Sequence, residues 1–193
     1  MAAVEGLRNP APTMVERRSV AVFGVVLALA SDLMLFAGFF SAYFLLRSRT
    51  EVWPPATVHL DTLGAAAGTV LLVASSVTVW KAQRALRAGD LVRTQRWLGS
   101  TILLGIGFAL NQLRDYRSIG FQPSDHAYGG IYWTLTGLHG VHVLVGIIAL
   151  AVLSWRVSRA PAASTTAFEA TALYWHLVDA VWLALFTTVW VIR

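Results

Sequence analysis

The chain has 193 residues, of which 56% are hydrophobic and only 13% are charged, and its mean hydropathy is +0.62. A soluble domain carries about 25% charged residues, so this composition favours a membrane protein and excludes a disordered or collagen-like chain. The 15 basic and 10 acidic residues leave a net charge of +5. The basic residues stand between apolar runs rather than on one polar face, which argues against a nucleic-acid partner. The absence of cysteine excludes disulfides and thiolate metal sites.

Five continuous apolar stretches predict five helices that cross a membrane. A helix needs about 20 apolar residues to span a hydrocarbon core of about 30 Å, and runs that do not alternate in polarity exclude transmembrane strands. We therefore predict an all-α integral membrane protein, a bundle of five transmembrane helices over residues 20–193 that follows an N-terminal tail of residues 1–19. In chain order the predicted spans are residues 20–46, 62–80, 98–113, 131–155 and 168–192.

Charges in the connecting segments predict the orientation of the bundle. The tail and the segments 81–96 and 156–159 together hold ten basic residues, whereas the segments on the opposite side hold five. Because basic residues are enriched in cytoplasmic loops, we expect the N-terminus and its tail in the cytoplasm and the C-terminus outside. The basic segment 81–96 is typical of a topology determinant, and its charges also attract anionic lipid headgroups.

Five ionisable residues lie inside the apolar spans, where such groups usually face the protein interior and find partners there. At about 1.5 Å per residue, Asp32 lies about 18 Å along the first span. Similar depths are reached in the last two spans by His139, His142, His176 and Asp179. Each pair spaced i, i+3 shares one helix face. We expect one buried polar cluster between packed helices, in which Asp32 bonds to His142.

Three kinds of site are compatible with this cluster. The simplest is a set of interhelical hydrogen bonds, worth about 1 kcal/mol each. A carboxylate–histidine chain also suits a proton relay, because histidine titrates near neutrality, although the spans lack further acids toward both surfaces. The His-x-x-His and His-x-x-Asp pairs supply four potential ligands for zinc, iron or copper, but not the carboxylates that a di-iron bundle takes from each of four helices.

A second polar group ends the third span near the predicted outer surface. It consists of Gln112, Arg114, Asp115 and Tyr116, and Trp53 lies on the same side after the first span. We expect these residues to form a hydrogen-bond network with an aromatic anchor at the membrane edge, or else a contact with lipid or with another subunit.

Several of these motifs together resemble subunit III of the haem–copper oxidases, the cytochrome c oxidase subunit 3 family. The most specific are TGLHGVHV at residues 136–143 and YWHLVDAVW at residues 174–182. Weaker matches in the family's order are SDLMLFAGFF at 31–40, WPP at 53–55, ASS at 74–76, QLRDY at 112–116 and SDHAYG at 124–129. The resemblance covers residues 20–193 and is to the short, five-helix form of the family, which lacks the first two helices of the longer form.

The resemblance implies an accessory function. Subunit III is similar across the family in carrying no haem and no copper, packing on subunit I, holding phospholipid in a cleft, and supporting proton uptake and stability during turnover. The chain is therefore expected to be a cofactor-free, non-catalytic subunit of an aerobic terminal oxidase that couples oxygen reduction to proton translocation in a bacterial plasma membrane. The implied partners are subunit I in direct contact, subunit II and membrane lipids, with haem and copper in the partner subunits.

Other interpretations differ in the complex or in the chemistry. The family usually has glutamate at the position of Asp32, and short relatives associated with nitric oxide reductases have aspartate there. An accessory subunit of a nitric oxide reductase, or of a quinol oxidase, is therefore the neighbouring interpretation, although WPP and QLRDY favour the oxidase branch. Two more distant interpretations are an independent proton channel and a membrane metal oxidase that uses His139, His142, His176 and Asp179.

Overall fold

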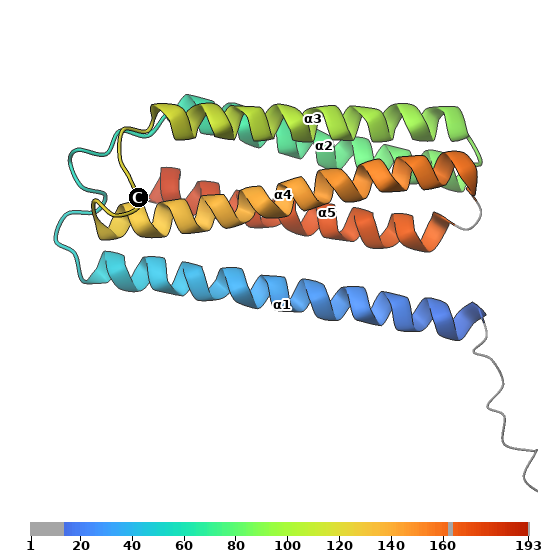
Figure 1. Ribbon diagram of the computed structural model, residues 1–193, viewed down its shortest axis with the longest axis horizontal. Coiled ribbons are helices and arrows are strands. Elements are labelled where there is room, and N and C mark those ends of the chain that lie inside the picture. The colour runs from blue at the N-terminus through green and yellow to red at the C-terminus, as the bar shows by residue number, and fades with distance from the viewer. Residues whose placement is uncertain (1–13, 162–163, 193) are drawn as a thin grey trace, which may run out of the picture.

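The computed structural model describes residues 14–161 and 164–192, and the regular elements in these ranges are helices (Figure 1). Their bounds are α1 Met14–Ser48, α2 Thr62–Arg87, α3 Leu91–Ser118, α4 Ala127–Arg159 and α5 Thr165–Phe186, which continues as the π-helical turn η2 Thr187–Ile192. No strand occurs in these two ranges. The prediction of an all-α fold with five helices is confirmed.

The predicted spans all lie inside observed helices, and the helices extend beyond the apolar runs to polar caps. Asp61 Oδ1 accepts the backbone N–H of Gly64 at 2.9 Å at the start of α2, and Asp90 Oδ1 accepts that of Arg93 at 2.9 Å at the start of α3. Such caps satisfy donors that the first helical turn leaves free. Gly89 closes the short α2–α3 turn with a φ of 76°, in the left-handed region that favours glycine.

Consecutive helices run in opposite directions (Figure 1). The end of α1, the start of α2, the end of α3 and the start of α4 lie at one end of the molecule, together with η2. The start of α1, the α2–α3 turn, the end of α4 and the start of α5 lie at the other end. This alternation is what a chain that crosses a bilayer repeatedly requires. Of the predicted tail, residues 1–13 lie outside the described ranges, and residues 14–19 belong to α1.

Four helical segments in the described ranges are long and apolar enough to cross a membrane by length and composition. They are Phe23–Ser48 of α1, Thr62–Arg87 of α2, Ala127–Arg159 of α4 and the segment Thr165–Ile192, which joins α5 and η2. Helix α3 has 28 residues, but polar side chains in its first and last turns reduce its mean hydropathy. Four helical segments of the described residues are therefore candidate membrane spans by length and composition, and the passage of α3 through the membrane stays a prediction.

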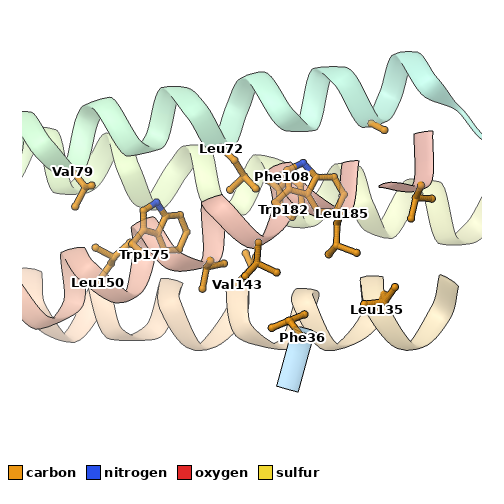
Figure 2. Packing of buried hydrophobic residues seen from close by; sticks show 14 of the residues in the cluster. Phe36, Leu72, Val79, Phe108, Leu135, Val143, Leu150, Trp175, Trp182 and Leu185 are labelled. Carbon is orange, nitrogen blue, oxygen red and sulfur yellow. The ribbon is translucent and has the colours of Figure 1, made fainter. Parts of the chain in front are cut away.

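Helices α2 to α5 pack around two tryptophans of α5 (Figure 2). Trp175 is fully buried, and its Nε1 donates to Ser75 Oγ of α2 at 2.8 Å. A Cβ atom at Gly105 of α3 or at Gly146 of α4 would lie 2.8 Å from the Trp175 ring. Because such a contact is sterically forbidden, glycine at these two positions lets α3 and α4 close on the ring. Trp182 is also buried, and its Nε1 donates to Thr69 Oγ1 at 3.0 Å.

Helix α1 lies along one side of the other four helices (Figure 1) and contacts mainly α4 and α5. In the most apolar stretch of α1 only 6% of the residues are buried, against 50% in the corresponding stretch of Thr165–Ile192. Its fully covered side chains are few: Phe36 reaches the edge of the core (Figure 2), and the Tyr43 hydroxyl donates to the Thr188 carbonyl at 3.3 Å. Most of the surface of α1 is thus left for lipid or for another chain.

Candidate functional site

Asp32 of α1 and His142 of α4 face each other across the contact between these two helices. Asp32 Oδ1 lies 3.6 Å from His142 Nε2, and the other ring nitrogen, His142 Nδ1, lies 2.8 Å from the carbonyl oxygen of Leu138. A carbonyl only accepts, so Nδ1 carries hydrogen in this geometry. Nε2 and the carboxylate then attract each other only when one further proton is present, either on the imidazole or on the carboxyl group. The Asp32–His142 pair therefore joins α1 to α4 through polar side chains.

The carboxyl group of this pair is accessible. The Asp32 side chain is 30% exposed, against 15% for His142. Asp32 lines a cavity of about 280 Å³ between α1, α4 and α5, and Tyr174 of α5 lines the same cavity. The Tyr174 hydroxyl donates to the backbone carbonyl of His142 at 3.1 Å, so that it fixes α4 against α5 beside the pair. The Asp32 carboxyl group is therefore open to this cavity while it contacts His142.

Three polar side chains, Ser76, His176 and Asp179, join α2 to α5. Ser76 Oγ lies 3.0 Å from His176 Nδ1, and the Ser76 hydroxyl also donates to Asp179 Oδ2. With the serine hydrogen directed to the carboxylate, its oxygen accepts from Nδ1–H of His176. The result is a chain of donors that runs from His176 through Ser76 to Asp179. Asp179 is buried between the packed helices, and its carboxyl group accepts the Ser76 hydroxyl there.

His139 is packed as an aromatic side chain. It is 1% exposed, and its ring centroid lies 5.0 Å from that of Trp182 and 5.8 Å from that of Phe108. Within the part of the chain that the structure describes, neither ring nitrogen has a hydrogen-bond partner. An imidazole without a charge partner is best accommodated in the neutral form, which suits packing between two aromatic rings.

The five residues expected in one cluster thus lie in three neighbouring places. The structure brings together Asp32 with His142, and His176 with Asp179, and it places His139 between aromatic rings. No group of three or more potential metal-ligating side chains gathers among the described residues. The first two places are joined by polar contacts, whereas His139 is packed between aromatic rings.

The residues expected at the outer membrane edge lie at the end of the molecule where α3 finishes. Arg114 Nη2 donates to Asp61 Oδ2 at 2.8 Å and joins α3 to the start of α2. The hydrogen bond from the Gly64 backbone and the Arg114 charge hold the pKa of Asp61 below its ordinary value of 3.8. Gln112 and Asp115 are buried, with 5% and 7% of their surface exposed.

Aromatic side chains also pack against one another at this end of the molecule. Tyr116 stacks on Trp133 of α4 with ring centroids 4.5 Å apart. Trp53, from the segment between α1 and α2, lies edge-on to Tyr43 at 5.3 Å and to Tyr128 at 5.0 Å. Trp53 is thus inserted between α1 and α4, where it fastens α1 at this end of the bundle.

Sequence reasoning from charge alone missed two site residues. Ser76 connects His176 to Asp179, and Tyr174 borders the cavity beside Asp32. A hydroxyl group carries no charge and is common in membrane helices, so neither residue is distinctive by composition. Both residues can be found only from the motifs that contain them. Ser76 ends the ASS triplet, and Tyr174 begins the YWHLVDAVW segment.

Comparisons with known proteins agree with this architecture. The chain matches the profile of the family described as "Cytochrome c oxidase subunit III" over residues 5–192. It is 38% identical over 183 residues to "Probable cytochrome c oxidase subunit 3" of Mycobacterium bovis, with 92% of this chain and 90% of the relative covered. It is 36% identical over 176 residues to "Cytochrome c oxidase subunit 3" of Synechocystis sp., with 89% and 75% covered. The protein of the same name from Thermostichus vulcanus is 30% identical over 175 residues, with 89% and 87% covered.

Proposed function

Because the chain belongs to the cytochrome c oxidase subunit III family, we propose that it is a non-catalytic subunit of an aerobic terminal oxidase in a bacterial plasma membrane. In this proposal the chain packs against subunit I, and the haem and copper of the complex are held by the other subunits. The observation that carries the proposal is the family match, which runs over residues 5–192.

The placement of the polar residues supports a role without a metal centre in this chain. His139 packs against two aromatic rings, and His142 uses Nδ1 for a backbone carbonyl. The remaining two candidates, His176 and Asp179, are joined through Ser76 on a different pair of helices. These side chains do not converge on one point, as the ligands of a catalytic metal must.

The Asp32–His142 pair supports a role in proton uptake. The pair is attractive only when it holds a proton, and its carboxyl group borders a cavity. A carboxyl group and an imidazole side by side at a cavity are the groups that a proton-transfer path requires. The accessory subunit would then supply protons to the oxidase and would also stabilise the complex during turnover.

The first test of the proposal is purification of the affinity-tagged chain in mild detergents. We expect a haem-bearing partner to co-purify, so that the reduced-minus-oxidised optical spectrum of the eluate contains haem bands. The chain separated from its partners should contain no stoichiometric iron, copper or zinc. A tagged membrane protein of another family is the control. Absence of haem from the eluate in every mild detergent would contradict the proposal.

We further propose that α3 is the fifth span and that the N-terminus lies in the cytoplasm. The up-and-down arrangement and the basic residues at the α2–α3 turn support this topology. Since the chain has no cysteine, single cysteines can be labelled without background. A membrane-impermeant thiol reagent should label an Ala56→Cys variant in intact cells and an Ala88→Cys variant only after permeabilisation. Labelling in the reverse pattern would invert the topology, and labelling of both variants from outside would exclude α2 as a span.

A further inference from the structure

Three basic side chains surround a cavity of about 480 Å³ between the end of α2 and the start of α3. They are Lys81 and Arg84 of α2 and Arg93 of α3, and Trp80 and Trp97 line the same cavity. We call this cavity the basic notch. The ammonium group of Lys81 lies 4.6 Å from the centroid of the Trp97 ring, and the Arg84 guanidinium lies 4.8 Å from that of Trp80. The two tryptophans therefore hold two of the cations in place at the edges of the notch.

The acidic residues near the notch are already engaged. Asp90, which also lines it, accepts the backbone N–H of Arg93 with Oδ1 at 2.9 Å and contacts Arg93 Nε with Oδ2 at 3.2 Å. Glu169 lies 3.7 Å from Arg87, which points away to α5. Among the ion pairs of the described residues, none engages Lys81 or Arg84 with a carboxylate. The notch therefore carries two cations that are free to receive an anion.

The notch lies where the apolar parts of α2 and α3 end. Trp80 is the last residue of the second predicted span, and Trp97 directly precedes the third. Tryptophan is enriched at the level of lipid headgroups. From the notch an exposed apolar stripe follows one face of α2, because Trp80, Val77 and Val73 are spaced by three and four residues and are 48%, 47% and 45% exposed. The cations therefore lie at the end of a strip that suits an acyl chain.

We propose that the basic notch binds the headgroup of one anionic phospholipid, with its phosphate beside Lys81 and Arg84 and one acyl chain along the Val73–Val77–Trp80 stripe. The inference rests on the proposed passage of α2 and α3 through the bilayer. The apolar stripe favours a lipid over free phosphate, because an inorganic anion uses only the cations. Anionic lipids gain from each basic side chain near the membrane surface, and the notch adds a shaped cavity to that attraction.

The test is titration of the detergent-solubilised full-length chain with dioleoyl phosphatidylglycerol, followed by native mass spectrometry. The double variant Lys81→Gln/Arg84→Gln should bind this lipid roughly 25-fold more weakly than the parent chain, from about 5-fold for each charge. The matched control is Arg156→Gln/Arg159→Gln, which removes two charges at the same end of the molecule, where Arg159 also stacks on a tryptophan, Trp155, at 5.0 Å. We expect the control variant to retain the affinity of the parent chain.

A third variant tests the shape of the notch without changing its charge. Ala85→Phe fills the cavity and should weaken binding of phosphatidylglycerol, whereas dioleoyl phosphatidylcholine should bind all variants equally weakly. Equal losses in both double variants, or full affinity of Ala85→Phe, would overturn the inference in favour of diffuse attraction. Displacement of the lipid by millimolar inorganic phosphate would overturn it in favour of a free-anion site. If the Ala88→Cys labelling holds while lipid binding fails, the error lies in the notch and not in the topology.

Discussion

Replacement of Trp175 by alanine is expected to destabilise the fold by about 3–5 kcal/mol. The indole is fully buried and bonded to Ser75, and it is enclosed by α3 and α4 at two glycines that approach within van der Waals distance of the ring. Alanine leaves a cavity that these helices cannot fill, because their backbones already touch other parts of the core. It also leaves the Ser75 hydroxyl without its donor.

The loss is measured as a shift in the denaturant or thermal midpoint of the purified chain. Trp155→Ala is the matched control, since the Trp155 side chain is 57% exposed and removal of its ring creates no internal cavity. We expect this control to change the free energy of unfolding by less than about 1 kcal/mol. Equal shifts for the two variants would show that Trp175 does not organise the packing of the four helices.

Replacement of His142 by leucine is expected to release the chain from the proposed oxidase complex. Asp32 would then lose its partner, at a cost of about 1–3 kcal/mol, below that of a fully buried charge because the carboxylate is 30% exposed. Since this contact is one of few that join α1 to α4, its loss should loosen α1. We expect a complex depleted of this chain, with the haem and copper spectra of the remaining subunits unchanged.

Two further variants separate the effect of charge from that of packing. Asp32→Asn keeps the shape of the side chain and removes the carboxylate, so the complex should assemble and then turn over more slowly or inactivate sooner. The double variant Asp32→Asn/His142→Leu should recover part of the stability lost in His142→Leu, because no charge is left unpaired. A double variant as unstable as the sum of the two single variants would exclude direct coupling. Loss of haem or copper signals in any of them would place this chain nearer to the chemistry than proposed.

The sequence predicted the helices well and their ends less well. Continuous apolar runs mark the part of a helix that lies in lipid, and all five runs lie inside helices. The runs do not mark where a helix ends in water, because there the backbone needs caps rather than apolar side chains. Helix α3 shows the difference, since its predicted span was 98–113 and the helix itself runs from Leu91 to Ser118. Its extra turns carry polar residues that composition assigns to loops.

The site was harder to predict, because sequence gives depth along a helix but not the partner that each face meets. His139 and His142 lie about 60° apart around α4, at about 100° per residue. With so small an angle the two histidines belong to one face of α4. Nevertheless, His142 meets Asp32 of α1, and His139 meets the rings of Trp182 and Phe108. The partners depend on how α1 and α5 are arranged around α4, and this arrangement is a property of the whole fold.

The loose attachment of α1 has a consequence for how the chain folds and works. Helices α2 to α5 share one interior, whereas α1 adds little buried surface of its own. Local opening occurs first where buried contacts are fewest, so amide protons of α1 exchange before those of the other helices when the chain is alone. In the proposed complex, a neighbouring chain that covers the outer face of α1 would supply the missing order. Because Asp32 of α1 and His142 of α4 lie 3.6 Å apart across the α1–α4 contact, such a neighbour would also fix the separation between the carboxylate and the imidazole.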